Sequence, residues 1–252
     1  MGGNMGLMPG KNIICSTVCV ALILVITPLF VFPDSGGVSP FAAEYLLKRS
    51  GFTIAVSEFR LSKKDTKTYI FESLSRPAGM VSLFKRVHAR ETSELGVTKN
   101  GFKPLNYAYV LEKRRNPQHY SNKFDWENKT VVIEEDGKKT SLTVSDNTLN
   151  RFTLQLMLMA DLGGNKEVLE YTILHKSKLE TFVFTRIGKE TIKTSTGSYS
   201  TVVIEGKKKD KSGGRVMTFW CAPSLNYLPV KIIQEKDDKQ LYTMFLTKVE
   251  GL

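Results

Sequence analysis

A cysteine near the C-terminus and three histidines are the side chains of this chain that best suit nucleophilic chemistry. Cys221 lies in the segment FWCAPSLNYLPVKIIQE, and the histidines are His88, His119 and His175. A thiol nucleophile needs a base beside it, and no histidine shares a motif with Cys221. The segment is strand-like, and a buried thiol in a strand is usually structural. We therefore interpret Cys221 as a structural thiol and expect no catalytic residue; spatial pairing with a histidine is the alternative.

The remaining polar residues predict neither a metal site nor a cofactor site. The cysteines and histidines lack zinc-type spacing, and Asp125, beside Trp126, has no second carboxylate at a useful spacing. Neither a P-loop nor a dinucleotide fingerprint is present, and the NKT sequon at Asn128 is a match by pattern alone. We expect no cofactor and no metal.

The N-terminal residues have the pattern of an export signal. Lys11 precedes an uncharged apolar run, residues 13–32. Signal cores run to roughly 15 residues and membrane-spanning helices need about 20, so the length alone does not decide between a cleaved signal and an anchor. Pro28 and the following PDSGGVSPFAA favour cleavage near Ala42 or Ala43, without a clean small-x-small motif. An uncleaved anchor in the inner membrane is the second alternative, and a core helix is the third.

The cysteines of the N-terminal segment bear on disulfide formation. Cys15 and Cys19 lie inside the apolar run and would leave with a cleaved signal. Cys221 would then be the sole cysteine of the mature protein. We therefore expect no internal disulfide, although the destination would be oxidising.

The chain is basic, with a net charge of +11. Residues 1–42 hold one lysine, Lys11, and one aspartate, Asp34, so the whole excess falls on residues 43–252. A basic surface favours anionic partners, such as an anionic membrane surface or an acidic polymer. A soluble basic surface without such a partner is the alternative. We expect no nucleic-acid partner, and the composition leaves the oligomeric state open.

Most of the chain after residue 43 follows the period-2 pattern of β-strands. Short apolar-polar alternations are separated by Gly, Asn and Asp, for example at Asp136-Gly137, which indicates a meander of antiparallel hairpins. The tip at residues 207–215 carries two glycines and five basic residues; it could touch a polyanion or be a solvated loop. The predicted strands lie within residues 52–62, 67–75, 103–115, 120–144, 178–194, 197–209, 215–223, 228–235 and 241–250.

One segment, residues 148–162, has helical periodicity instead. Leu149, Phe152, Leu156 and Met159 fall on one stripe, with polar residues before it and glycines after it. We expect this helix to cover one face or mouth of the sheet. The four side chains are the candidate apolar lining of a ligand cavity; a sealed core is the plainer alternative.

The segment around Cys221 reads as a structural corner between two strands. Trp220 belongs to the first strand, Pro223 fixes φ in the turn, and Asn226 can adopt a left-handed conformation. Tyr227 leads into the next strand, where Pro229 is tolerated as the first residue.

Five segments resemble the bacterial DUF3108 family. They are GMVSLFKRV (79–87), GFKPLNYAY (101–109), KFDWENKTV (123–131), GKETIKTSTGSYSTVVIE (188–205) and FWCAPSLNYLPVKIIQEKD (219–237). The similarity covers residues 45–250 in order, and Ser195 stands where the family often has proline. It implies an exported envelope protein of Gram-negative bacteria, with no catalytic role attached, and a shape similar to the open antiparallel barrels of lipoprotein carriers.

These observations give one expected architecture and three functional hypotheses. We expect residues 1–42 to be a signal peptide or anchor with a linker, and residues 43–252 to be a single mainly-β domain. Its fold would be a curved antiparallel sheet or half-open barrel with one covering helix. The favoured function is non-enzymatic: binding a lipid or other apolar or amphipathic envelope molecule in the periplasm, or supporting envelope assembly. An envelope enzyme acting on peptidoglycan or glycan is the first rival, and a purely structural interaction protein is the second.

Overall fold

The computed structural model describes residues 38–83, 87–113, 115–164, 166–210, 214–237 and 239–252. The predicted export segment, residues 13–32, lies outside them, as do Cys15 and Cys19. Among the described residues no helix has the length and apolar character needed to cross a membrane.

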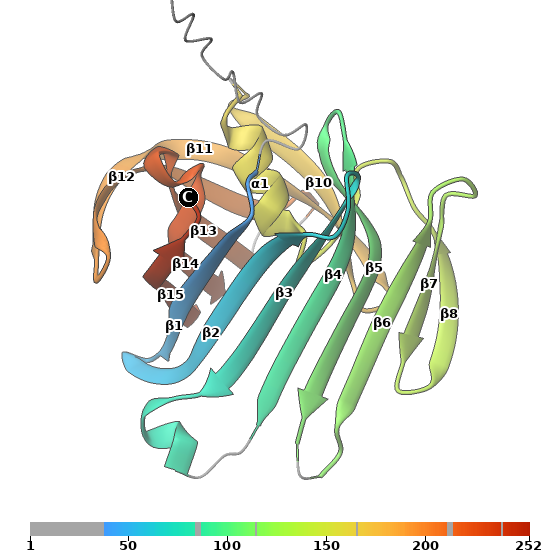
Figure 1. Ribbon diagram of the computed structural model, residues 1–252, viewed down its shortest axis with the longest axis horizontal. Coiled ribbons are helices and arrows are strands. Elements are labelled where there is room, and N and C mark those ends of the chain that lie inside the picture. Colours follow the sequence, from blue (N-terminus) through green and yellow to red (C-terminus); the bar gives the residue numbers. More distant parts are fainter. Residues whose placement is uncertain (1–37, 84–86, 114, 165, 211–213, 238) are drawn as a thin grey trace, which may run out of the picture. The chain divides into compact units, whose positions relative to one another are not determined.

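Fifteen strands of the described residues form one sheet, in the order β8-β7-β6-β5-β4-β3-β2-β1-β15-β14-β13-β12-β11-β10-β9 (Figure 1). Neighbours pair antiparallel except β9 and β10, which pair parallel. The bounds are β1 Phe41–Arg49, β2 Phe52–Lys63, β3 Thr68–Pro77, β4 His88–Thr98, β5 Gly101–Glu112, β6 Gln118–Asp125, β7 Thr130–Glu135, β8 Lys138–Thr143, β9 Thr148–Asn150, β10 Val168–His175, β11 Lys178–Thr194, β12 Gly197–Lys208, β13 Arg215–Ala222, β14 Leu228–Lys236 and β15 Lys239–Glu250. The predicted mainly-β, curved and unclosed architecture is confirmed.

Alternation of side chains gives the sheet one apolar and one polar face. In β1, Phe41, Ala43 and Tyr45 are buried while the residues between them are partly exposed, as expected for a strand covered on one side. Asp136 and Gly137, both with positive φ, form the predicted tight turn of the β7–β8 hairpin.

The sheet rolls, so that its two ends approach each other. Leu174 of β10 is buried in a small cluster with Phe124 of β6 and Val131 and Ile133 of β7. The hydroxyl of Tyr120 in β6 donates a 2.8 Å hydrogen bond to the carbonyl oxygen after β10, at Lys176. The edges remain unpaired strands: β9 has only three residues and β8 carries lysines, and both features discourage pairing with another chain.

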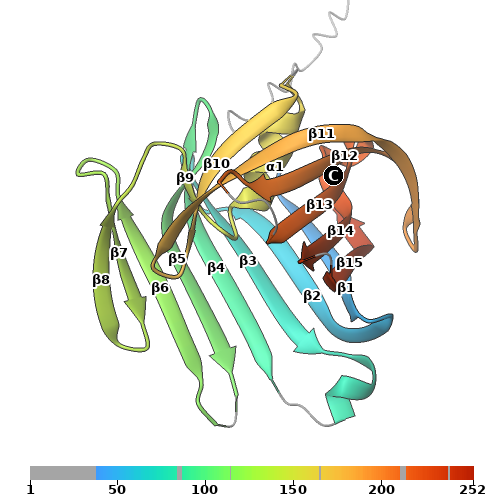
Figure 2. The ribbon, with the colours of Figure 1, turned by 180° about the vertical axis from the view of Figure 1, so that it is seen from behind.

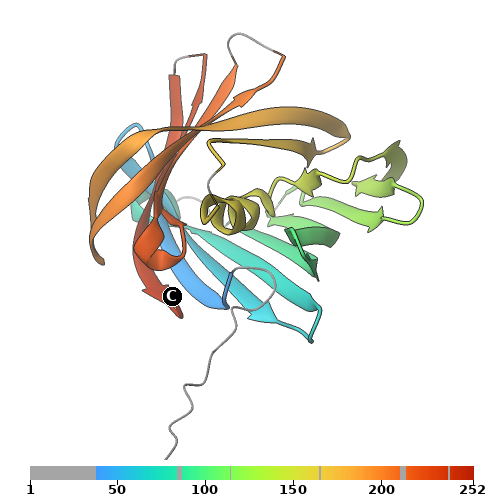
Figure 3. The same cartoon turned by 90° about the horizontal axis from the view of Figure 1, so that it is seen from above.

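The helix α1, Leu154–Leu162, lies within the curve of the sheet (Figures 1 and 3). Leu154, Leu156, Met157, Leu158, Met159 and Leu162 are all buried. A helix with buried apolar side chains on most of its circumference belongs in a core, and the strands surround this one. Its C-terminal carbonyls are capped by Arg186, whose Nη2 donates to the oxygens of Leu162 at 2.7 Å and Gly164 at 2.9 Å.

The helix begins later than the sequence pattern predicts. Residues 148–150 form β9 and pair with β10, beside which they lie in Figure 2. The side-chain oxygen of Asn150 then accepts hydrogen bonds from the backbone N–H groups of Phe152 (3.0 Å) and Thr153 (2.8 Å). The free edge of β10 therefore supplies backbone partners that local helix propensity cannot match, and the helix starts at Leu154.

The corner after β13 has the predicted turn geometry. Pro223–Leu225 form one turn of 3₁₀ helix, and Asn226 is left-handed with φ 48°. Tyr227 also has positive φ, and its N–H donates to the oxygen of Ala222 at 2.9 Å. Pro229 is the second residue of β14 rather than the first, and its carbonyl accepts a 2.8 Å hydrogen bond from the buried Tyr45 hydroxyl.

Trp220 ties the same corner to neighbouring strands. Its indole N–H donates to Glu190 of β11 at 2.5 Å, and the ammonium of Lys231 in β14 lies 4.0 Å from the ring centroid. One aromatic side chain beside the corner thus joins three strands.

Candidate functional site

A cavity of about 200 Å³ lies on the concave face, at the N-terminal side of α1. Its apolar lining comes from the helix region and from strands at both ends of the chain: Phe59, Phe152, Leu154, Ile173, Phe182, Met217, Phe219, Ile232 and Met244. An engineered cavity of roughly 150 Å³ lined by Leu, Ile and Phe takes up benzene. The volume therefore suits an aromatic ring or a short length of acyl chain.

The strand register explains why these side chains converge. Phe219 of β13 pairs with Ile232 of β14, and Met217 pairs with Gln234. Residues two apart share a face, so the same inner face continues to Arg215, which pairs with Lys236. The inner face of this hairpin thus changes from apolar to cationic toward one end.

A polar group interrupts the apolar wall where β9 leads into α1. Nη2 of Arg151 lies 2.9 Å from Oε2 of Glu91 in β4, and the same oxygen accepts a 2.6 Å hydrogen bond from Tyr107. Burial, followed by the charge of Glu91, raises the pKa of the Tyr107 phenol. Arg151 lines the cavity and keeps 45% of its side-chain surface accessible.

A second hollow, of about 580 Å³, continues the cavity toward the ends of the strands. The two hollows share His175, Glu180, Phe182 and Arg215. The further lining residues are mostly cationic: Lys176, Lys178, Lys208 and Lys236, with Glu135. Burial, and then the nearby positive charges led by Arg151, lower the pKa of His175. The apolar cavity therefore opens through a basic mouth.

The four predicted lining residues do not form one surface. Phe152 lines the inner cavity and stacks on Phe71, with ring centroids 4.3 Å apart. Leu149 lies in β9 and lines a different hollow, of about 840 Å³, beside the second half of α1. Leu156 and Met159 are 0% and 2% exposed and pack in the core. A binding role for the set stays a prediction, and Phe152 is its member at the inner cavity.

The structure places Cys221 in the packed interior. Its residue exposure is 0%, and burial raises the pKa of the thiol, which opposes thiolate formation. Among the described residues it takes part in no disulfide and lines none of the hollows described above. His175 faces the cavity, whereas His88 and His119 are exposed. The described residues hold no group of three or more His, Cys, Asp or Glu side chains arranged to bind a metal.

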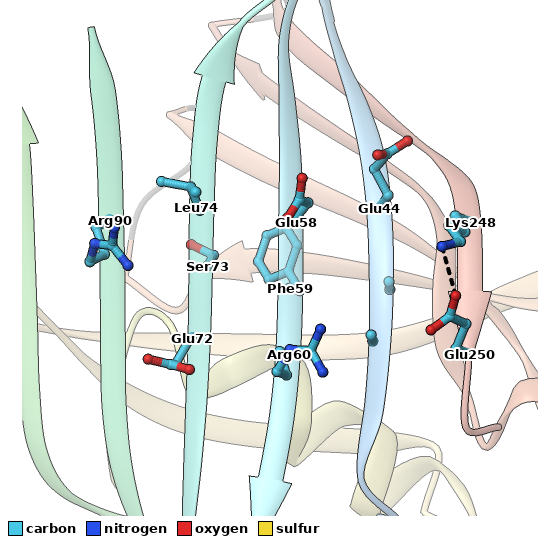
Figure 4. Close-up of a pocket in the computed structure, with 12 residues that line it drawn as sticks. Glu44, Glu58, Phe59, Arg60, Glu72, Ser73, Leu74, Arg90, Lys248 and Glu250 are labelled. Atoms are coloured by element: carbon cyan, nitrogen blue, oxygen red, sulfur yellow. Dashed lines mark ion pairs between the residues drawn. The ribbon is translucent and has the colours of Figure 1, made fainter.

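The outer face carries a hollow of about 340 Å³ with a different character (Figure 4). Its charged lining has both signs: Glu44, Glu58, Arg60, Glu72, Arg90, Lys248 and Glu250. Lys248 and Glu250 form an ion pair at 2.7 Å, and Arg76 pairs with Glu58 from beside the hollow. Charges of both signs on an exposed sheet face are typical of a solvated surface. The inner cavity is therefore the better candidate site.

The sequence also carried a signal for the mouth. The segment 207–215 is strongly basic, and two of its cations, Lys208 and Arg215, occupy inner-face strand positions. The alternation Arg215, Met217, Phe219 along β13 places the arginine on the same face as two apolar side chains. That pattern could have separated Arg215 from the solvated tip.

The family model "Protein of unknown function (DUF3108)" matches residues 42–247. The chain belongs to the DUF3108 family. The resemblance predicted from the five sequence segments is therefore confirmed. A search of the curated proteins finds no significant match.

Among solved structures, the DUF3108 chain is similar to the "Beta-barrel-like Protein of Domain of Unknown Function DUF1849 from Brucella abortus". The TM-score is 0.56 at 11% identity, covering 84% of this chain and 97% of the other. At that identity the likeness concerns the fold alone, and it agrees with the rolled, unclosed sheet.

Proposed function

We propose that this protein binds an apolar or amphipathic molecule of the cell envelope in the inner cavity, without chemical turnover. The observation that carries the proposal is the apolar cavity enclosed by the rolled sheet and α1. Small-molecule sites are mostly apolar hollows with a few placed polar groups. This cavity combines nine aromatic, aliphatic or methionine side chains with polar groups, which are the Glu91–Arg151 pair, Gln155, His175, Glu180, Arg215, Gln234 and Tyr242.

Two methionines of the lining support a site that adapts to its ligand. Met217 of β13 and Met244 of β15 face the cavity and are only partly buried. Methionine is flexible and polarizable, and surfaces that accept varied apolar partners use it often. A sheet that rolls without closing also leaves the mouth accessible.

The enzyme alternative, action on peptidoglycan or glycan, is less well supported by the geometry. The carboxylates at the cavity and its mouth are engaged: Glu91 with Arg151 at 2.9 Å, Glu180 with Lys208 at 2.7 Å, and Glu135 with Lys176 at 2.7 Å. The side-chain hydrogen bond of Lys208 lowers the pKa of Glu180, which favours its ionised form. A general acid in a glycosidase needs the opposite, a carboxyl group with a raised pKa.

The location belongs to the same proposal. We place the folded part in the periplasm because Lys11 and the uncharged residues 13–32 have the pattern of an export signal. The same residues would serve as a tether to the inner membrane where no cleavage takes place. A cavity with a basic mouth would then face the lipids of the envelope.

A cavity-filling variant tests the binding proposal. The full chain is titrated with N-phenyl-naphthylamine, a neutral dye that fluoresces in apolar surroundings. We expect saturable binding, and we expect Met217→Trp to weaken it at least tenfold, about 1.4 kcal/mol, because the indole occupies the cavity. The matched control is Val216→Trp, which adds the same ring to the opposite face of β13.

The outcomes separate the hypotheses. Loss of binding in Met217→Trp with unchanged binding in Val216→Trp supports the proposal. Absence of saturable binding by the parent protein, or equal binding by both variants, contradicts it and favours the structural-interaction hypothesis. Thermal unfolding of each variant shows that the comparison is made between folded proteins.

A further inference from the structure

We infer that the ligand of the inner cavity is an amphipathic anion: an apolar chain ending in a carboxylate or phosphate that Arg215, Lys178 and Lys236 hold at the mouth. This inference rests on the proposed function and deepens it by naming the chemical class of the ligand. The charge balance of the mouth and the strand positions of the cations support it.

The first observation is that basic residues stand at one end of five neighbouring strands. β10 ends at His175, β11 begins at Lys178, β12 ends at Lys208, β13 begins at Arg215 and β14 ends at Lys236. All five line the same hollow. The mouth of the apolar cavity is therefore surrounded by cationic or ionisable side chains on one side of the roll.

The second observation is that these positions belong to the inner face. Arg215 is two residues from Met217, and Lys236 is two residues from Gln234, both of which line the cavity. Lys178 is similarly two residues from Glu180. Side chains two apart along a strand point to the same side. The cations thus face the cavity mouth, whereas cations at solvated hairpin tips would have no preferred face.

The third observation is the charge balance of the lining. Each of the three carboxylates is paired with one cation: Glu91 with Arg151, Glu135 with Lys176, and Glu180 with Lys208. Within the described part of the chain, no ion pair involves the other three cations, Lys178, Arg215 and Lys236. The mouth therefore has three positive charges in excess of its carboxylates.

An anionic head group fits this arrangement. Arg215 and Lys236 are directly paired across β13 and β14, so their side chains stand beside each other at the end of the apolar wall. A guanidinium binds carboxylate and phosphate in a bidentate manner, and a neighbouring ammonium adds a compact charge. An acyl chain in the cavity would place its polar end at this pair.

The test compares ligands that share one chain and differ in head group. Displacement of N-phenyl-naphthylamine from the full chain is measured with dodecanoate, dodecyl phosphate, dodecanol and dodecyl trimethylammonium, each below its micelle concentration. We expect the two anions to bind at least tenfold more tightly than dodecanol, and the cation to bind most weakly. Raising the salt concentration should reduce the advantage of the anions, because exposed charges are screened.

A charge-matched pair of double variants assigns the effect to the mouth. Arg215→Gln with Lys236→Gln should bring the anions to the affinity of dodecanol, with each affinity corrected for the dye affinity measured on the same variant. The control, Arg60→Gln with Arg90→Gln, removes two cations from the outer hollow and should preserve the preference. A preference that survives the first double variant, or disappears equally in the control, overturns the inference.

Two further outcomes distinguish failure of this inference from failure of the proposed function. Dye binding without any preference for anions overturns this inference and leaves the proposed function standing, whereas absence of dye binding overturns the proposed function itself. Inorganic phosphate alone is then tested as a competitor of dodecyl phosphate, with displacement of the dye as the readout. Competition at equal concentration would identify a site for free anions and contradict a head-group site; no competition agrees with the inference.

Discussion

Glu91 of β4 holds Arg151 at 2.9 Å in the wall of the inner cavity, just before α1 begins. The pair joins two parts of the chain 60 residues apart in sequence, and Tyr107 completes it by donating to the same carboxylate oxygen. Arg151 also lies 5.6 Å from the Tyr109 ring centroid. The arginine is thus positioned from several sides, while part of its surface stays accessible to a ligand.

Removing the negative charge of this pair should strengthen binding of anions. In Glu91→Gln the amide can still accept from Tyr107, and Arg151 loses its counter-charge. We expect dodecanoate to bind severalfold more tightly relative to dodecanol, as measured by displacement of the dye. The control is Glu72→Gln, which neutralises a carboxylate of the outer hollow. An unchanged dodecanoate affinity in Glu91→Gln would show that Arg151 does not face the bound anion.

Leu156 of α1 should behave as a core residue. It is 0% exposed and lines neither of the two hollows that form the proposed site. We expect Leu156→Ala to lower the free energy of unfolding by about 2–5 kcal/mol in urea titrations, with dye binding retained below the transition. Leu179→Ala, at a side chain 37% exposed, should change stability by less than about 1 kcal/mol. A small loss in Leu156→Ala accompanied by altered dye binding would place a cavity at the helix instead.

Cys221 should be needed for packing and for nothing else. The buried thiol fills space beside the corner after β13, so Cys221→Ala should cost about 1–2 kcal/mol of unfolding free energy, as expected for a small truncation. Cys221→Ser should cost stability as well, since it buries a hydroxyl. Each variant is then tested for complementation of a deletion strain. A stably folded Cys221→Ser protein that fails to complement would restore the hypothesis of a nucleophilic cysteine.

Gly206 of β12 should tolerate no side chain. A Cβ built there would lie 2.2 Å from Cε1 of Phe184, a residue that is 1% exposed. We expect Gly206→Ala to destabilise the protein by roughly 1–3 kcal/mol because the ring must leave its position. Gly96→Ala is the matched control in β4, since its Cβ would meet Leu105 at an ordinary 3.5 Å. Equal stability of the two variants would mean that Phe184 can be repositioned freely.

Export is tested by fractionation. Because residues 13–32 are uncharged and follow Lys11, we expect the protein in the periplasm or on a membrane that faces it. Intact mass then separates cleavage near Ala42 from an uncleaved anchor. Recovery of the full-length chain from the cytosol would contradict the proposal.

Local patterns were enough to predict most of the sheet, because period-2 alternation and turn residues such as Asp136 and Gly137 act within a hairpin, but no predicted strand covered β1, β4 or β10. The left-handed Asn226 was predictable for the same reason. The start of α1 was not, since the strand conformation of Thr148–Asn150 depends on the free edge of β10, which no local pattern reveals. Apolar periodicity through residues 148–162 therefore merged a strand, a turn and a helix into one predicted stripe.

Only the apolar nature of the site was predictable from the sequence. An apolar lining was expected, and Phe152 is part of it, but the rest comes from strands such as β13 and β15 whose inner faces meet only when the sheet rolls. The ion pair of Glu91 and Arg151 is equally a product of tertiary structure. Charge counting found the basic excess of the chain, whereas strand register was needed to place Arg215 and Lys236 at one mouth.

The most direct test of the account is native mass spectrometry of the protein extracted gently from its own envelope. We expect a population carrying one additional small molecule, released on unfolding and identified in negative-ion mode as an acyl chain with a carboxylate or phosphate group. The same preparation of Met217→Trp should lack it, and Val216→Trp should retain it. A parent protein that carries no ligand, or a ligand retained equally by Met217→Trp, would contradict binding in the inner cavity.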